Sequence, residues 1–242
     1  MRVLRIARFK AKLSQFDFII ADETINLVQN LVGSGELSSL VPERTWLETE
    51  KVFKADNFNE YFITLINLNA FNQIYPDLKD LDSEFFSSHL ILESAKQDYS
   101  PEIRFASIFY SLLKRGEKDI KNRIEAMQEN MRFANSYKRL PIILNNSLAL
   151  IEEDTSKFTA DHQLRIIESI DAIRNPENLD QISKLIMLDR SIDFTKKITL
   201  LQKALDHAKS IRLKNLDESK LAGNEIAKHI RELRLKAIES NQ

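Results

Sequence analysis

A short row of cations near the start of the chain has the residue types and spacing to bind phosphates or base edges. If residues follow one another at about 100° around a helix, Arg5, Arg8 and Lys12 fall within roughly 60° of one face. Phe9, Leu13 and Ile6 fall together on a neighbouring arc, so we expect this apolar arc to be buried. Arginine is suited to planar, bidentate recognition of phosphates and bases. A cationic face that meets only solvent is the alternative.

Residues for nucleophilic or zinc chemistry do not come together in the sequence. A nucleophilic triad needs a serine or cysteine with a histidine base and a carboxylate, and the chain contains no cysteine. Its four histidines are scattered, and no His-Glu-x-x-His pattern occurs. The histidines are His89, His162, His207 and His229. We therefore assign no catalytic residue.

The pair Asp80 and Asp82 has a spacing that can bind magnesium ions. Metal-assisted phosphoryl chemistry would also need a phosphate-binding loop nearby, and none precedes the pair. Gly33 and Gly35 form a Gly-x-Gly that follows an expected helix instead of a strand, which makes it a poor phosphate loop. We interpret the acidic pair as a solvated loop and predict no metal site.

Composition favours an all-α protein. Only four glycines and five prolines occur in 242 residues, which is little turn chemistry for strand connections, while helical periodicity runs through the chain. We expect about 10–12 helices. They cover residues 1–13, 22–32, 42–54, 57–68, 83–97, 100–114, 117–132, 139–151, 162–173, 176–188, 195–211 and 218–238. The first helix begins abruptly at Met1, as in a chain that starts partway through a larger protein.

Charge and cysteine content restrict the partners and the compartment. The net charge is −1, so a surface for nucleic acid must be local, as the first helix is. The absence of cysteine excludes disulfides and fits the cytoplasm. No apolar run approaches the length of about 18 residues that a membrane span needs, so we expect no membrane partner.

Three segments resemble the bacterial class II CCA-adding tRNA nucleotidyltransferases, which complete the 3′ end of tRNA. The first is Arg2-Val-Leu-Arg5-Ile-Ala-Arg8-Phe9. The second, and the most specific, is Ser34-Gly-Glu-Leu-Ser-Ser-Leu-Val-Pro-Glu43-Arg44-Thr-Trp-Leu-Glu48. The third joins Ile167-Glu-Ser-Ile-Asp171-Ala-Ile-Arg174-Asn-Pro176 with residues 223–238. The resemblance is strong over residues 1–75 and loose after that.

The resemblance implies roles for residues of the first two segments. Arg2 matches an arginine that pairs with the edge of the incoming base, although its aspartate partner would lie before Met1. Arg5 and Arg8 match arginines on the same helix that contact the nucleotide. These three are the expected nucleotide-binding residues.

A structural brace is implied for Glu43, Arg44 and Glu48, whose family counterparts support the junction between catalytic head and neck. We expect Glu43 and Arg44 to be buried together, because an unpaired buried charge is costly.

The chain also departs from the family pattern in two ways. The Gly-Ser loop and Asp-x-Asp pair of the catalytic head have no counterpart here. Some relatives carry an HD phosphohydrolase domain, and residues 106–114 resemble the segment with its adjacent His-Asp pair. Tyr110 and Ser111 replace those two ligands, and His89 corresponds at most to the first ligand. We therefore expect a degenerate HD-like body.

The resemblance predicts a neck-like helical domain at residues 1–75, a degenerate HD-like body at 76–155 and a C-terminal helical tail at 156–242. The function that it implies is base selection and tRNA binding within a CCA-adding transferase, with a catalytic head in cis or trans.

ATP, CTP and tRNA are the expected partners, and this chain alone is expected to be inactive. Magnesium is implied for the intact enzyme, and no cofactor for this chain alone. The alternative is a helical interaction or scaffold module that has lost nucleotide and tRNA function.

Overall fold

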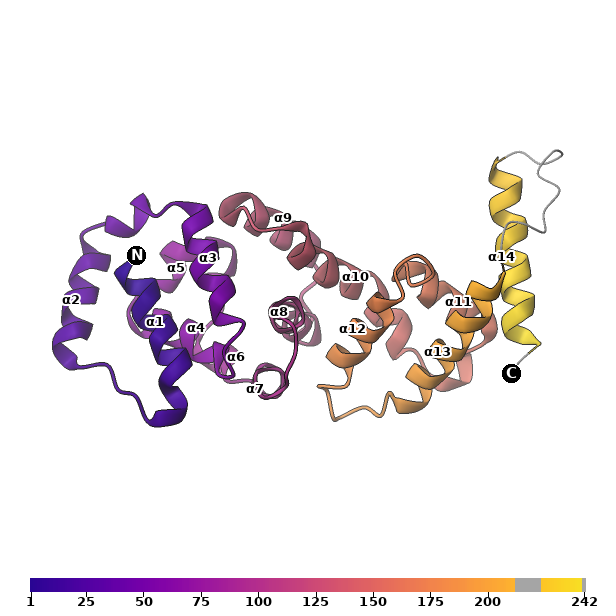
Figure 1. Cartoon of the computed structure of the whole chain (residues 1–242), viewed down its shortest axis with the longest axis horizontal. Helices are drawn as coiled ribbons and strands as arrows, with labels where there is room; N and C mark the ends of the chain where they lie inside the picture. Colours follow the sequence, from indigo (N-terminus) through magenta and orange to yellow (C-terminus); the bar gives the residue numbers. More distant parts are fainter. Residues whose placement is uncertain (212–222, 241–242) are drawn as a thin grey trace. The chain divides into compact units, whose positions relative to one another are not determined.

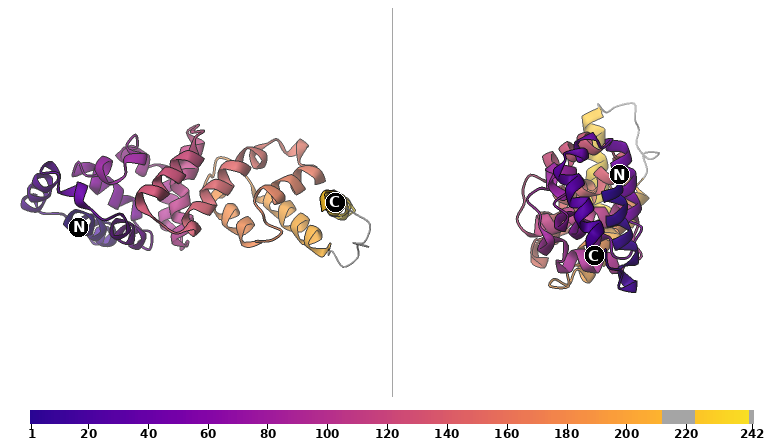
Figure 2. Two further views of the ribbon diagram at one scale, coloured as in Figure 1. Left: turned by 90° about the horizontal axis from the view of Figure 1, so that it is seen from above. Right: turned by 90° about the vertical axis from the view of Figure 1, so that its left-hand side faces the viewer.

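The computed structural model describes residues 1–211 and 223–240, and Figures 1 and 2 show its helices. Fourteen α-helices and four short 3-10 helices account for all regular structure in these ranges, and no strand occurs there. The all-α prediction is confirmed. The chain divides into two compact units, residues 1–142 and residues 143–242, and each is described by itself.

The first unit contains the helices from α1 to α9, and the second contains those from α11 to α14. Helix α10 carries the boundary between the units and includes Pro141. The bounds are α1 Arg2–Leu13, α2 Asp22–Gly33, α3 Pro42–Val52, α4 Phe58–Asn67, α5 Phe71–Ile74, α6 Ser83–Phe86, α7 His89–Lys96, α8 Pro101–Lys114, α9 Ile120–Met131, α10 Asn135–Glu152, α11 Ala160–Ser169, α12 Glu177–Ile186, α13 Thr195–Ser210 and α14 Gly223–Glu239. The short helices are η1 Ser14–Phe16, η2 Glu36–Ser39, η3 Pro76–Leu78 and η4 Thr155–Lys157.

Two differences raise the number of helices above the expected 10–12. The apolar turn at residues 71–75 forms helix α5, and the expected helix at 83–97 is divided into α6 and α7. Asp82 caps α6 by accepting the N–H of Phe85 at 2.8 Å, and Ser88 then takes an extended conformation before α7. The part of the expected helix 218–238 that precedes residue 223 lies outside the described residues.

One core extends through the first unit. Trp46 of α3 packs edge-on against Phe105 of α8 and Tyr137 of α10, with ring centroids 5.5 and 4.9 Å apart. Buried side chains from Val3 to Tyr137 belong to the same cluster. The position after residue 75, where the sequence suggests a domain boundary, therefore lies inside a compact unit. The functional division into neck, body and tail stays a prediction.

Arg104 links the segments that follow α3 and α7 through hydrogen bonds made from within the core. Its side chain is almost fully buried and donates to the carbonyls of Phe53, Ala55 and Gln97 at 3.1, 3.0 and 2.6 Å. The first two carbonyls follow α3, and the third follows α7. A buried carbonyl that loses its donor is costly, so this cation stabilises the fold.

Two cations, Lys197 and Arg231, connect helices of the second unit. Lys197 of α13 donates to the backbone carbonyls of Ile151, at 2.8 Å, and of Glu153, near the end of α10. Arg231 of α14 reaches α11, where it contacts Asp161 at 2.8 Å and Glu168 at 3.2 Å. These contacts join α13 and α14 to the earlier helices of the unit.

We predict that Arg104→Ala lowers the free energy of unfolding of the first unit by about 3 kcal/mol, because it leaves buried carbonyls without a donor. Fluorescence of Trp46, the only tryptophan of the chain, reports this unit during urea unfolding. Lys54→Ala is the control, since Lys54 is exposed and should change stability by less than about 0.5 kcal/mol. Equal stability of the two variants would contradict this account.

Candidate functional site

Helix α1 buries small side chains and turns its arginines outward. Its buried stripe consists of Val3, Leu4, Ala7 and Ala11, and it packs against α3 and α4. Phe9 is 42% exposed, so the expectation that the arc of Phe9 and Leu13 is the buried one is wrong. The two alanines lie four residues apart on one face, where short side chains allow close packing of the neighbouring helices.

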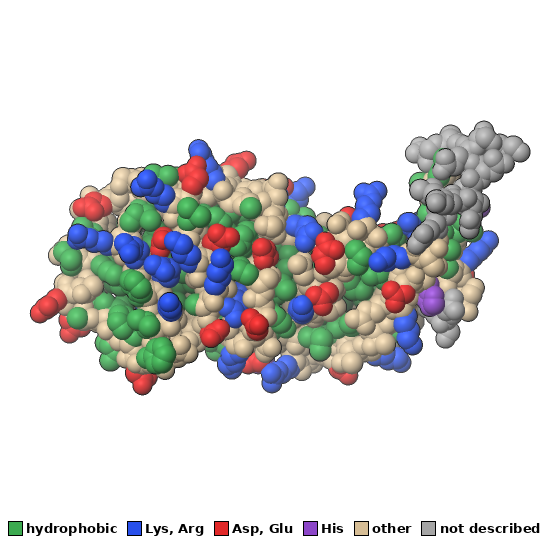
Figure 3. Space-filling view, in the orientation of Figure 1, with side chains coloured by type: hydrophobic (Ala, Val, Ile, Leu, Met, Phe, Trp, Pro, Cys, Tyr) green, Lys and Arg blue, Asp and Glu red, His purple; other side chains and the backbone are tan. Residues whose placement is uncertain are grey.

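We define the cation row of α1 as Arg2, Arg5, Arg8 and Lys12. It lies on the face of the helix opposite the buried stripe. Arg2, Arg5 and Lys12 are exposed, and Arg8 is half-buried. Figure 3 shows Lys and Arg side chains gathered around the start of the chain, with apolar side chains between them. Exposure fits a ligand surface and also a solvated cationic face.

Arg8 is held by a carboxylate from α3. Its Nε lies 2.8 Å from Oε2 of Glu48, and Nζ of Lys51 lies 2.8 Å from Oε1 of the same carboxylate. Burial alone would raise the pKa of Glu48, but the hydrogen bond from Lys51 and the charge of Arg8 outweigh it and hold the pKa below its ordinary value. The ion pair with Glu48 therefore holds the guanidinium group of Arg8 in place.

A chain of buried hydroxyl groups lies next to Glu48. The hydroxyl of Tyr75 is 2.6 Å from that of Thr49 and 3.0 Å from that of Tyr61. Burial raises the pKa of Tyr61 to about 12 and also raises that of Tyr75, so both phenols stay protonated. These bonds hold α3 to α4 and to the residue after α5, and so they fix the position of Glu48.

The expectation that Glu43 and Arg44 are buried together is wrong. Arg44 is exposed and makes no ion pair within the described residues. Glu43 contacts Arg132, after α9, at 2.7 Å instead. Consecutive residues of a helix point about 100° apart and do not face one another, which explains why the two neighbours do not pair. Of the three residues predicted as a brace, only Glu48 is buried, and its arginine partner is Arg8.

Arg44 lies instead beside Arg2. Both line a pocket of about 480 Å³ formed by α1, η2 and the start of α3, together with Glu36 and Ser39. Nothing in the sequence marks Glu36 as a pocket residue, and Arg44 was expected in a buried brace instead. Arg2 and Arg44 are far apart in the chain, so only the fold brings them to one pocket.

The residues expected to replace a metal-binding pair are part of the core. Tyr110 and Ser111 are both buried in α8, whereas His89 is exposed at the first position of α7. Buried Tyr110 fills space in the interior, which fits a body in which this helix serves packing.

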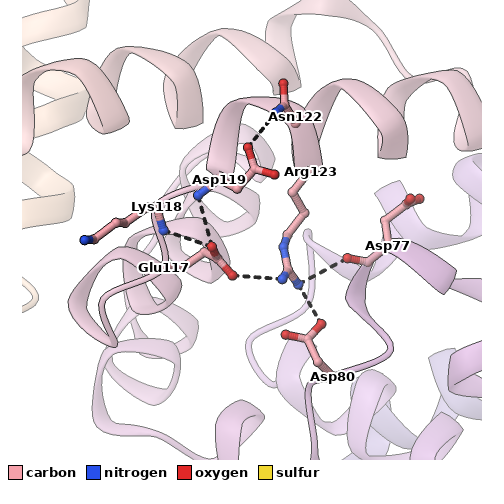
Figure 4. A network of polar contacts seen from close by, with 7 residues as sticks. All are labelled: Asp77, Asp80, Glu117, Lys118, Asp119, Asn122 and Arg123. Carbon is pink, nitrogen blue, oxygen red and sulfur yellow. Dashed lines mark hydrogen bonds and ion pairs between the residues drawn. The ribbon is translucent and has the colours of Figure 1, made fainter.

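Asp80 and Asp82 both have structural partners, and Figure 4 shows those of Asp80. Asp80 accepts from Arg123 of α9 at 2.6 Å, and this hydrogen bond lowers the pKa of Asp80. Arg123 also contacts Glu117 at 2.9 Å and the carbonyl of Asp77 at 3.2 Å. Asp82 caps α6. The loop is thus not merely solvated, because its first carboxylate anchors it to α9.

The described residues contain neither a metal-binding cluster nor a membrane-spanning helix. Among the described residues, no group of three or more His, Cys, Asp or Glu side chains is arranged to hold a metal ion. The described residues therefore offer no cluster of ligands for a magnesium ion. In the same residues, no helix combines the length and apolar character needed to cross a bilayer.

Comparison with known proteins gives one family match within the chain. Residues 17–81 match the family described as "Probable RNA and SrmB- binding site of polymerase A". The matched segment runs from the residue after η1 to the loop before α6 and includes Glu43, Arg44 and Glu48. No solved structure matches the chain.

Curated relatives include several proteins named "Multifunctional CCA protein". One from Acinetobacter baumannii strain ATCC 17978 is 33% identical over 125 residues, which cover 46% of this chain and 30% of the relative. One from Acinetobacter baylyi is 26% identical over 205 residues, which cover 74% of this chain and 49% of the relative. The chain thus spans about half or less of the length of these relatives. The matches confirm the predicted resemblance as homology to bacterial multifunctional CCA proteins.

We predict that Arg8 and Glu48 stabilise the first unit as a pair. In a double-mutant cycle of Arg8→Ala and Glu48→Gln, followed through Trp46 fluorescence, the coupling energy should be about 1 kcal/mol or more, since both side chains are largely buried. Coupling energies below about 0.3 kcal/mol would show that the contact is incidental.

The same pair predicts a dependence of stability on pH. Because folding lowers the pKa of Glu48, its stabilising contribution is present above the ordinary value of 4.5 and is lost as the pH falls through the lower folded value. The difference in unfolding free energy between the wild type and Glu48→Gln should therefore shrink below pH 4.5. A difference that stays constant from pH 7 to pH 3 would count against this assignment.

We predict that Arg44→Ala changes the free energy of unfolding by less than about 0.5 kcal/mol, because Arg44 is exposed and makes no ion pair in the described residues. Thermal unfolding of the two proteins measures the difference. A loss of about 3 kcal/mol, as a buried brace would give, would contradict the exposed position.

Proposed function

We propose that this chain, a homologue of bacterial multifunctional CCA proteins, provides base selection and tRNA binding for a CCA-adding tRNA nucleotidyltransferase in the cytoplasm. The observation that carries the proposal is the outward cation row of α1, placed immediately before the segment that matches an RNA-binding family at residues 17–81. Homology to the relatives supports the reaction class.

Each arginine of the row has a distinct proposed role. Arg2, beside the pocket, would read the edge of the incoming base, as its family counterpart does. Arg5 projects into solvent, where it can meet a phosphate of the nucleotide. The Nε of Arg8 faces Glu48, so the terminal nitrogens of its guanidinium would meet the ligand in a fixed orientation.

Binding of tRNA would rest on contacts to phosphates and on shape. RNA helices present their backbone and 2′-hydroxyl groups, so a protein can hold a tRNA without reading its sequence. The net charge of −1 means that this affinity must come from local surfaces such as the cation row.

Catalysis would need a head domain in cis or trans. We propose that this head holds the magnesium ions that act with ATP and CTP, and that this chain alone is inactive. Seven of the nine exposed large hydrophobic side chains in the described residues lie within residues 1–47, which supports a protein contact at this end of the first unit. They are Met1, Phe9, Phe16, Ile19, Leu27, Val41 and Leu47.

The same apolar surface favours the second candidate function. A helical interaction or scaffold module that has lost its nucleotide and tRNA roles would also expose apolar side chains to a protein partner. The two candidates differ in whether the chain binds tRNA.

We predict that the chain binds tRNA lacking its 3′ end at low salt, and that affinity falls as salt rises because phosphate contacts release counterions. Arg5→Ala should weaken binding at every salt concentration and lower the slope of log K against log salt by about 1. Fluorescence anisotropy with labelled tRNA measures both quantities.

The matched control is Arg165→Ala, which removes an exposed arginine of α11 in the second unit. It should leave affinity closer to that of the wild type than Arg5→Ala does. Affinity that is unmeasurable even at low salt would reject the tRNA role and favour the scaffold module.

A further inference from the structure

The second unit contains a small pocket that the proposed function does not use. It lies among α11, α13 and α14, which pack against one another (Figure 1). Its volume is about 230 Å³. An engineered apolar cavity of about 150 Å³ holds benzene, so this pocket has room for a six-membered ring with a small substituent. The apolar part of its lining consists of Phe158, Leu200, Ala204 and Ile238.

Much of the pocket wall belongs to the packed interior of the second unit. Phe158, Ala204 and Ile238 are 7% exposed or less. Gln163 is also buried, and its amide nitrogen donates to the carbonyl of Phe158 at 2.9 Å. This hydrogen bond holds the side chain of Gln163 against the segment that precedes α11. Because these side chains are already held in place, a ligand would meet a pre-formed site and would need little ordering of the protein.

Two basic side chains line the pocket, and no described carboxylate does. Lys203 and His207 lie four residues apart on α13, so they share one face of the helix. Lys203 is exposed, His207 is half-buried, and neither makes an ion pair within the described residues. Lys197 of the same helix, by contrast, donates to backbone carbonyls at the end of α10. The ammonium group of Lys203 is therefore available to a ligand.

The charge of this lining indicates the class of ligand. Lys203 brings one positive charge, which a single carboxylate neutralises in a charge-assisted hydrogen bond. A phosphate monoester carries about −1.5 to −2 charges at neutral pH, so part of its charge would stay uncompensated beside apolar side chains. The ring of His207 can donate a hydrogen bond to the second carboxylate oxygen. The lining thus fits a compact apolar body that carries one carboxylate.

From these observations we infer that the pocket is a binding site for a small monocarboxylate with an aromatic or branched apolar body. The apolar walls contact the body of the ligand, and Lys203 and His207 bind its carboxylate. The site lies wholly in the second unit, so the inference does not depend on the function proposed for the cation row of α1.

Titration of the full chain with benzoate, followed through backbone amide NMR shifts, tests this site. Benzyl alcohol has nearly the same size without the charge, and acetate has the charge without the ring. Benzoate should bind more tightly than either, with saturable shifts in residues 158–163 and 200–207. Equal affinity for benzoate and acetate, or for benzoate and benzyl alcohol, would overturn the inference, and so would the absence of a saturable shift.

Lys203→Gln separates the contribution of charge from that of the apolar walls. It should weaken the binding of benzoate about tenfold or more, as expected for loss of a charge-assisted hydrogen bond, and leave that of benzyl alcohol unchanged. Lys203→Arg keeps the charge and should retain most of the affinity for benzoate. A lysine that only supported the fold would instead weaken both ligands together when it is replaced by glutamine.

Lys209→Gln is the matched control, because it removes an exposed lysine of α13 that does not line the pocket. It should bind benzoate as the wild type does. The inference is overturned if Lys203→Gln binds benzoate as tightly as Lys209→Gln, since the carboxylate would then not meet Lys203.

Discussion

The ion pair between Arg8 and Glu48 connects the interior of the first unit to its cationic surface. Glu48 is nearly buried, and the hydroxyl chain of Thr49, Tyr75 and Tyr61 holds its helix in place. Its carboxylate meets the Nε of Arg8 at 2.8 Å. Because α1 buries its other stripe against α3 and α4, this contact also fixes which way the cation row faces. The orientation of the row thus depends on the core beneath it.

Much of the fold could be predicted because helical periodicity and end signals are local. Pro101 after Ser100 marks the start of α8, and Gly116 takes the left-handed conformation just after its end, as the pattern indicates. The helix predicted at 83–97 is divided into α6 and α7 because Ser88 takes an extended conformation between them. Local patterns also cannot show that Trp46 and Tyr137 share one core, since that contact depends on the tertiary fold.

The candidate site was predictable in part for the same reason. The outward position of Arg5 follows from its spacing along α1. The partners of Glu43 and Glu48 cannot be predicted from spacing, because Arg132 and Arg8 come from other parts of the fold. The expectation of a Glu43–Arg44 pair assumed that the side chains of adjacent residues face each other, which does not happen on a helix. Sequence motifs therefore pointed to a segment that a family model also matches, but they could not show which of its residues pair with other helices.

We propose that the chain meets RNA and nucleotide at the surface formed by α1, η2 and the start of α3. Mapping of backbone amide shifts on adding tRNA that lacks its 3′ end tests it most directly, because the method locates contacts without any substitution. We expect the largest shifts in residues 1–13 and 36–44, with Arg2, Arg5 and Arg44 among them. Shifts confined to residues 143–242, or an unchanged spectrum at saturating tRNA, would contradict it.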